Sequence, residues 1–341
     1  MIYSWILDSG GAGRGAWQGG ILFEFMRWCR RNESFPAITM GASAGGYAAA
    51  DVATGTEKTV MKGWTVWGSR EQLQRTASLN DDGNASFNGF RKHLCASIQY
   101  VMEDAELDGV YNGDTRKKLV VFTTRARRRD ERKFQGTDRF RYFLKTATRK
   151  LHRPFKYLPG GYIEETVVFA ANLPEQLRSE YVRPLTRSNY HAVLEASCLV
   201  PLAMGSPLTP EAISTEYPEA DSGSVFFDGS YTLKMPMGVF EEDPRFQDLA
   251  QWVRADKTLV FCCDPRGVLW ENSMRLRSLN SLPDVRRALE ENRLLVIYPE
   301  HKIEAGFLST DNPTIMRTFN RGREQADRLL QSDRVRRFFQ I

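Results

Sequence analysis

The 341 residues combine apolar and charged residues in ordinary proportions, so the chain is long enough to bury a large core. No stretch approaches the roughly 18 consecutive apolar residues of a membrane-spanning helix, and the first residues lack the basic and apolar regions of a signal peptide. We therefore expect a cytoplasmic protein. The five cysteines and four histidines are scattered without zinc-ligand spacing, so we expect free thiols, no metal site and no cofactor.

One segment concentrates the positive charge. The formal net charge is +5, but the range Arg125 to Lys156 contains 13 Lys or Arg residues against three acidic ones. Its cations alternate with aromatic residues, a pattern that suits peripheral contact with an anionic membrane, where each cation contributes about 1 kcal/mol. A solvated loop explains the same pattern equally well. No nucleic-acid motif accompanies the segment, so we expect no nucleic-acid partner.

The first fifty residues predict two parallel strands joined by a helix. Residues 3–7 are expected to form a strand, and the glycine-rich stretch 9–15 is expected to be a loop. A helix follows, because apolar residues recur at helical spacing from Trp17 to Cys29, and residues 32–36 end it. The second strand runs into Ser43. The glycine-rich stretch and Ser43 should therefore share the carboxyl edge of the sheet, where ligands bind in open α/β folds.

Strands and helices continue to alternate downstream. Residues 57–115 are predicted to be helical with loops, with Trp64 and Trp67 in the core or in a lid. Further strands are expected at 119–124, 166–170, 225–227, 258–263 and 294–298, and further helices at 175–182, 189–197, 281–292 and 313–339. This alternation predicts an α/β fold with a mostly parallel central sheet flanked by helices.

The sequence Gly41-Ala42-Ser43-Ala44-Gly45 matches the G-x-S-x-G pattern of a nucleophile elbow. It follows a short apolar strand and precedes a run of small residues that suits the start of a helix. In such a sharp turn the serine hydroxyl is exposed and the helix N-terminus offers N–H groups to a developing anion. An ordinary turn into a helix has the same composition.

The glycine-rich stretch has two functional interpretations. Gly11-x-Gly13-x-x-Ala16, with Glu33 as the ribose-binding acid, is a weak dinucleotide fingerprint. Alternatively, consecutive glycine N–H groups converge on one point and form an oxyanion hole, to which Arg14 adds positive charge. A P-loop is excluded, because no Gly-Lys-Ser/Thr follows.

Two residues are candidates for activating Ser43. Asp228-Gly229 follows a predicted strand and either faces the serine or forms a plain turn. His301 is the one histidine after Asp228, so the chain order Ser, Asp, His permits a classical hydrolase triad. The surroundings of His93, His152 and His191 show no motif.

Four blocks, in order, resemble the patatin-like phospholipase family. The stretch Gly10-Gly11-Ala12-Gly13-Arg14-Gly15 is similar to the family's Gly-Gly-Gly-x-Arg/Lys-Gly motif, with Ala12 in place of a glycine. The other blocks are Gly41–Gly45, which matches the nucleophile motif; Ala196–Pro201, which resembles Ala-Ser-x-x-x-Pro; and Asp228-Gly229-Ser230, which resembles Asp-Gly-Gly/Ala.

The resemblance implies a three-layer patatin-like fold and a lipid acyl hydrolase of the phospholipase A or lysophospholipase type. Ser43 would be the nucleophile and Asp228 its base, without a catalytic histidine. The oxyanion hole would be formed by Gly10, Gly11, Ala12, Gly13, Arg14 and Gly15, the elbow by Gly41 and Gly45, and the second motif by Gly229. Residues 1–240 would be the catalytic region, and 241–341 would complete or extend the same domain. The substrate would be a phospholipid or another acyl ester. Two alternatives are an esterase that uses His301, and a non-catalytic lipid- or protein-binding module.

Overall fold

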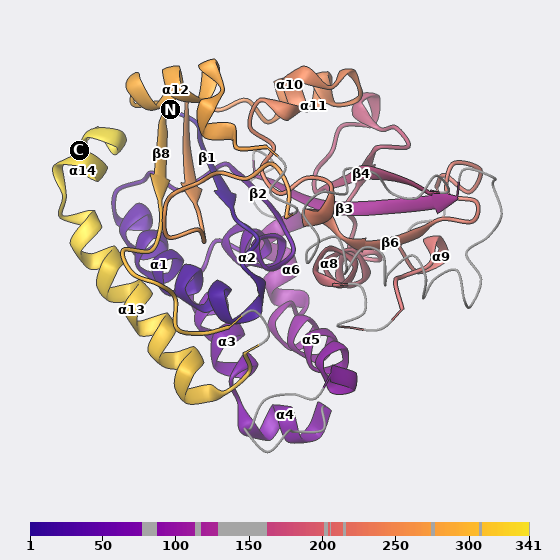
Figure 1. The fold of residues 1–341 in the computed structure, drawn as a ribbon, viewed down its shortest axis with the longest axis horizontal. Coiled ribbons are helices and arrows are strands. Elements are labelled where there is room, and N and C mark those ends of the chain that lie inside the picture. Colours follow the sequence, from indigo (N-terminus) through magenta and orange to yellow (C-terminus); the bar gives the residue numbers. More distant parts are fainter. Residues whose placement is uncertain are drawn as a thin grey trace.

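A computed structural model describes residues 1–76, 87–112, 117–128, 162–200, 204, 206–213, 216–273, 277–306 and 309–340. Within them, eight strands form one sheet in the order β5-β4-β3-β2-β1-β7-β8, with β6 paired to β3 (Figure 1). The strands are β1 Tyr3–Leu7, β2 Ile38–Ala42, β3 Lys118–Arg128, β4 Tyr162–Ala170, β5 Val182–Pro184, β6 Val225–Asp228, β7 Lys257–Phe261 and β8 Leu294–Ile297. The pairs β3–β2, β2–β1, β1–β7, β7–β8 and β4–β5 are parallel. Strands β4 and β6 run antiparallel to β3.

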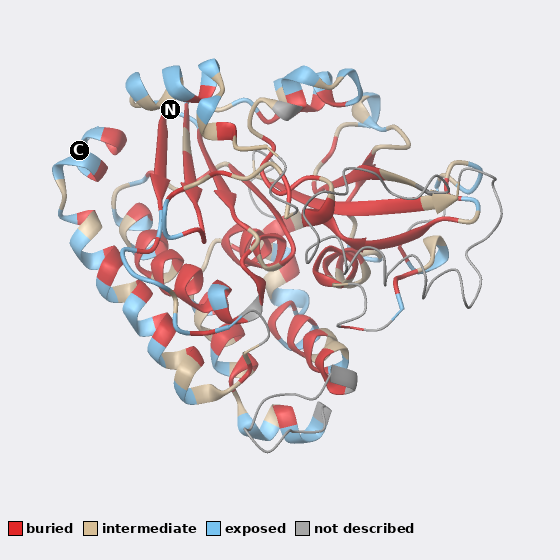
Figure 2. Cartoon of the chain, in the orientation of Figure 1, coloured by how far each residue is buried: buried red, intermediate tan, exposed pale blue. Residues whose placement is uncertain are grey.

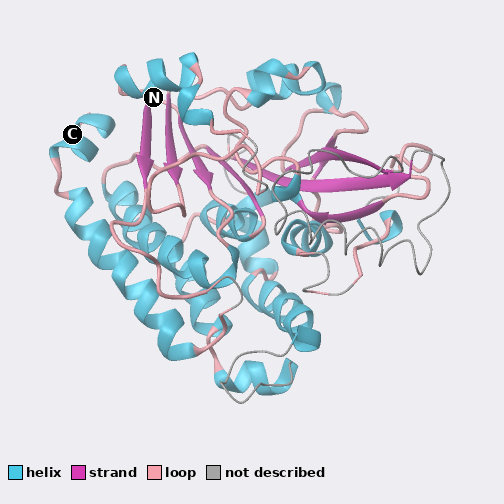
Figure 3. Cartoon of the chain, in the orientation of Figure 1, coloured by secondary structure: helices cyan, strands magenta, loops and turns pink. Residues whose placement is uncertain are grey.

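Helices cover both faces of this sheet (Figure 3). They are α1 Gly11–Arg31, α2 Ala44–Ala53, α3 Glu57–Trp67, α4 Arg70–Thr76, α5 Phe87–Val101, α6 Asp104–Tyr111, α8 Tyr190–Cys198, α9 Pro210–Ile213, α10 Val239–Glu242, α11 Gln247–Trp252, α12 Pro283–Glu290, α13 Asn312–Leu330 and α14 Asp333–Phe339. The predicted α/β class with a mostly parallel sheet flanked by helices is confirmed.

Alternate strand residues face two separate apolar clusters, because successive side chains of a strand point to opposite faces. Trp5 and Leu7 pack with the layer that contains α1, α2, α3, α8 and α13, whereas Ile6 packs with the layer of α10, α11 and α12. The strands are therefore buried along their length, and the helices expose their outer sides (Figure 2).

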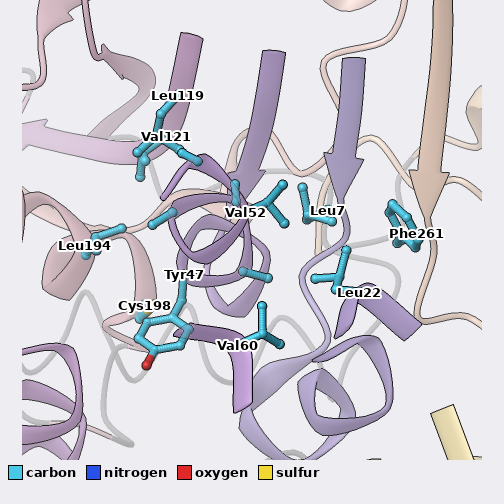
Figure 4. Packing of buried hydrophobic residues seen from close by; sticks show 14 of the residues in the cluster. Leu7, Leu22, Tyr47, Val52, Val60, Leu119, Val121, Leu194, Cys198 and Phe261 are labelled. Carbon is cyan, nitrogen blue, oxygen red and sulfur yellow. The ribbon is translucent and has the colours of Figure 1, made fainter. Parts of the chain in front are cut away.

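Helix α2 belongs to the first layer and begins at the carboxyl edge of the sheet. Figure 4 shows Val52 directed towards the strands beside Leu7, while Tyr47 points away from the sheet beside Cys198. Further out, α13 lies along α1 (Figure 1), where Trp17 donates a hydrogen bond from its indole nitrogen to Gln325 Oε1 at 2.9 Å.

Three local predictions were wrong. The glycine-rich stretch is not a loop, because α1 already begins at Gly11. Residues 175–182 form only the short 3₁₀ turn Glu175–Leu177, and Val182 begins a strand beside β4. The single helix expected over 313–339 is divided into α13 and α14, because the Ser332 hydroxyl accepts the Val335 N–H and caps a new helix.

Candidate active site

Ser43 occupies a tight turn between β2 and α2. Its backbone angles are φ 57° and ψ −135°, a region that costs a residue other than glycine about 1–3 kcal/mol. The turn needs glycine on both sides. A Cβ on Gly41 would lie 2.2 Å from the Gly45 carbonyl oxygen, and a Cβ on Gly45 would lie 2.1 Å from that of Leu7. The G-x-S-x-G stretch thus forms the strained strand–turn–helix geometry of an elbow.

The topology explains why Asp228 lies beside Ser43. The long strand β3 pairs with β2 through Phe122, opposite Ala42, and then with β6 from Thr123, opposite Asp228. Since β2 runs parallel and β6 antiparallel to β3, their carboxyl ends meet head to head. Ser43 and Asp228 are the residues at this junction, although 185 positions separate them in the chain.

The two side chains form a direct hydrogen bond. Ser43 Oγ donates to Asp228 Oδ2 at 2.8 Å, and both residues are buried, with exposures of 3% and 1%. The second carboxylate oxygen, Oδ1, accepts the Ser230 N–H at 2.8 Å. The residue between Asp228 and Ser230 must be glycine, because a Cβ on Gly229 would lie 2.0 Å from the Phe122 carbonyl oxygen. The carboxylate is therefore held in position to accept the serine proton.

Ser197 in α8 fixes the backbone of Ser43. Its hydroxyl accepts the Ser43 N–H at 3.0 Å and donates to the Phe122 carbonyl oxygen at 2.7 Å. Ser197 lies in the sequence block Ala196–Pro201, but this role was not predicted. Only that sequence block could have indicated the role of Ser197, because its two partners, Ser43 and Phe122, are distant from it in sequence.

The stretch from Gly10 to Gly15 lies at the start of α1. Gly10 is the N-cap residue, and Gly11 has φ 71°, a conformation that favours glycine. The first N–H groups of a helix have no acceptor within the helix, so this end of α1 presents donors and a positive dipole. Gly11 lines the pocket that contains Ser43, Gly13 and Gly15 are buried, and Arg14 is exposed. Ala12 lies in the same first turn.

A largely apolar pocket opens at Ser43. Its cavity volume is about 50 Å³, so the apolar walls lie close together in this structure. Gly11 and Ser43 form its polar end; its remaining walls come from Ala44, Tyr47, Gly63, Trp64, Trp67, Phe90, Leu94, Cys198, Val200 and Met204. Trp64 and Trp67 are thus both core residues and pocket walls. Burial raises the pKa of the Tyr47 phenol and of the Cys198 thiol well above their ordinary values, so both groups stay neutral.

The histidines lie apart from this pair. His301 is exposed and, among the described residues, makes no hydrogen bond or ion pair with Ser43 or Asp228. His93 is buried against the Trp67 carbonyl oxygen, and His191 contacts that of Met102. His152 lies outside the described residues. The triad alternative with His301 therefore has no geometric support.

The start of the basic segment is structural. Arg125 is buried in β3 and forms ion pairs with Glu165, Glu180 and Asp221 at 3.0–3.1 Å, so it is not available to a membrane. Arg127 is also tied to Glu165, at 3.3 Å. The rest of the segment, from 129 to 156, lies outside the described residues.

Neither a membrane-spanning helix nor a metal-binding cluster is present among the described residues. Their helices include none with the length and apolar character needed to cross a bilayer. The same residues hold no cluster of three or more His, Cys, Asp or Glu side chains suited to a metal ion.

Comparison with protein-family models and with curated proteins finds no match for this chain. Its function is therefore inferred from the motifs and from the geometry of the site.

Proposed function

We propose that this chain is a serine acyl-ester hydrolase that acts on lipids, with Ser43 as nucleophile and Asp228 as base. The observation that carries the proposal is the 2.8 Å hydrogen bond between these side chains at a strained elbow that opens into an apolar pocket. The order and spacing of the motifs, which resemble patatin-like phospholipases, support the same conclusion.

The chemistry follows from the geometry in two steps. Ser43 Oγ attacks the ester carbonyl carbon while its proton passes to Asp228, and the leaving alcohol takes that proton as the acyl-enzyme forms. Asp228 then removes a proton from water as the water oxygen attacks the acyl carbon. The bond from that carbon to Ser43 Oγ breaks, Oγ takes the proton back from Asp228, and the fatty acid is released. Because a carboxylate is a weak base for an alcohol, the site needs strong stabilisation of the tetrahedral oxyanion.

We propose that the starts of two helices supply this stabilisation. The Ser43 N–H is already bonded to Ser197, so it is not a free donor. The Ala44 N–H, the first in α2, and the N–H groups of the first turn of α1 remain as candidates. Removing one donor from an oxyanion hole typically costs about 10²–10³ in rate.

Fatty-acid release tests the proposal. Wild type, Ser43→Ala and Asp228→Asn are each incubated with vesicles that mix anionic and neutral phospholipids, and the products define the acyl position that is cut. We expect Ser43→Ala to be inactive and Asp228→Asn to lose about 10²–10⁴ in kcat, the usual contribution of a general base. Activity that survives Ser43→Ala would refute the assignment.

Labelling by a fluorophosphonate probe serves as an independent readout of the nucleophile. Wild type should be labelled at Ser43, whereas Ser43→Ala should not be labelled. The variant Ser97→Ala, which removes a buried serine hydroxyl outside the site, is the matched control and should be labelled like wild type. A wild type that is neither active nor labelled would favour the non-catalytic alternative.

A further inference from the structure

A second pocket lies at the carboxyl edge of the same sheet. Its walls include Ser9 after β1, residues 263–266 after β7, residues 302–303 after β8, and Arg14 in α1. Its cavity volume is about 370 Å³. The first residues of α1 separate it from the pocket at Ser43, because Gly11 lines that pocket whereas Ser9 and Arg14 line this one.

Two of the four cations in this second pocket are balanced by carboxylates. Lys234 Nζ lies 2.7 Å from Asp8 Oδ1, and the lysine side chain is only 11% exposed. Burial disfavours its ammonium form, but the Asp8 carboxylate outweighs this and raises the pKa of Lys234, which stays charged. Arg266 pairs with Asp264 at 3.0 Å.

The other two cations carry the surplus charge. Within the described part of the chain, neither Arg14 nor Lys302 has an ion-pair partner, and both line the pocket. The pocket therefore holds about two positive charges in excess. The positive end of the α1 dipole lies beside Arg14 and adds to this potential. A phosphate monoester carries about −1.5 to −2 charges at pH 7, which matches the surplus.

We propose that this pocket binds a phosphate group, with Lys302 and Arg14 as its direct cationic contacts and Lys234 as a fixed charge at its base. Resting on the proposed function, the inference goes one step further: the phosphate is the headgroup of the lipid whose acyl chain occupies the pocket at Ser43. Both pockets adjoin the start of α1, so a single phospholipid can extend from one pocket into the other. A free phosphate compound has the same recognition chemistry and is the other source that the test separates.

The first experiment measures binding without catalysis. Inorganic phosphate is titrated into full-length Ser43→Ala at constant ionic strength, since salt screens exposed charges. We expect saturable binding that weakens about tenfold in Ser43→Ala/Lys302→Gln, because a hydrogen bond to a charged group contributes about that much.

Lys58→Gln in the same background is the matched control. Like Lys302, Lys58 is an exposed lysine without an ion pair among the described residues. It lies far from the second pocket, because its neighbour Glu57, the first residue of α3, pairs with Arg30 near the far end of α1. Arg30 lies about 24 Å along that helix from Arg14. Phosphate binding that is absent, or that Lys302→Gln and Lys58→Gln alter equally, would overturn the proposal.

The second experiment identifies the source of the phosphate. Wild type, Lys302→Gln and Lys58→Gln are compared on phosphatidic acid and on diacylglycerol with the same acyl chains, both in neutral detergent micelles. For a headgroup site, the ratio of kcat/KM for phosphatidic acid to that for diacylglycerol falls about tenfold in Lys302→Gln alone. Weakened phosphate binding with an unchanged ratio overturns the headgroup assignment in favour of a free phosphate compound. If the protein binds phosphate specifically but cleaves no ester, the proposed phosphate pocket stands and the proposed hydrolase activity is refuted.

Discussion

Ser197→Ala tests whether the hydroxyl of α8 positions the nucleophile. The substitution removes one acceptor and one donor, so it leaves both the Ser43 N–H and the Phe122 carbonyl without their partner at a site where Ser197 itself is fully buried. Each unsatisfied buried group costs about 1–3 kcal/mol, so the free energy of unfolding should fall by about 2–6 kcal/mol.

The same substitution should also lower the catalytic rate. With its N–H released, the Ser43 turn is less constrained, and a misplacement of about 1 Å at a reacting group costs about 10²-fold. We expect kcat to fall by about 10- to 100-fold on a short-chain p-nitrophenyl ester with little change in KM, because Ser197 lies behind the nucleophile and not in the wall of the pocket. Urea denaturation and steady-state kinetics on the same preparations measure both effects.

Ser97→Ala provides the comparison. Ser97 is also a helical serine that is 1% exposed, but its hydroxyl has no hydrogen-bond partner among the described residues. Its removal should leave stability and kcat unchanged or raise stability slightly. The positioning role is refuted if Ser197→Ala and Ser97→Ala behave alike in both assays.

Three further outcomes follow from buried charges and from the pocket. Burial raises the pKa of Asp51 well above its ordinary 3.8, so the folded state keeps a proton that the unfolded chain releases, and stability falls as pH rises above about 4. Asp51→Asn should therefore gain in melting temperature over wild type as pH rises from 4 to 8; a constant difference would contradict this. Asp221→Asn should cost about 3–5 kcal/mol in urea denaturation, because it leaves Arg125 and Arg183 without their shared buried carboxylate. Leu94→Trp should fill the pocket at Ser43 and lower kcat/KM for long-chain relative to short-chain esters about tenfold or more; an unchanged ratio would mean that acyl chains lie elsewhere.

Local patterns predicted the part of the site that local forces determine. The strand Tyr3–Leu7, the turn at Ser43 and the strand before Asp228 were predicted from apolar runs and small residues, and all three are present. The position of the glycine-rich stretch and Ser43 at one sheet edge followed from the parallel order of β1 and β2. The contact with Asp228 required the family resemblance, because the antiparallel approach of β6 to β3 is a long-range pairing that periodicity does not indicate.

Two of the three errors occur where distant contacts decide the structure. A glycine run usually indicates a loop, yet the run here starts a helix because its small residues pack closely against neighbours such as Trp64 and Cys263. Val182 continues a strand because β4 lies beside it, although the sequence pattern suggested a helix. The break between α13 and α14 was detectable, since Ser332-Asp333 is a standard capping sequence.

The head-to-head junction of β2 and β6 on β3 has a consequence for how such a protein can diverge. Strand register brings Ser43 and Asp228 together, whereas α2, α3, α5 and the end of α8 with the residues after it supply most of the pocket at Ser43. Insertions and deletions in α3 to α6 can thus change the shape of this pocket while the distance between Ser43 and Asp228 is preserved. A one-residue deletion inside β3 would have the opposite effect, because it would separate the pair and leave the pocket helices intact. The strands that position the Ser43–Asp228 pair and the helices that line most of the pocket are therefore separate segments of this chain, and each can change without the other.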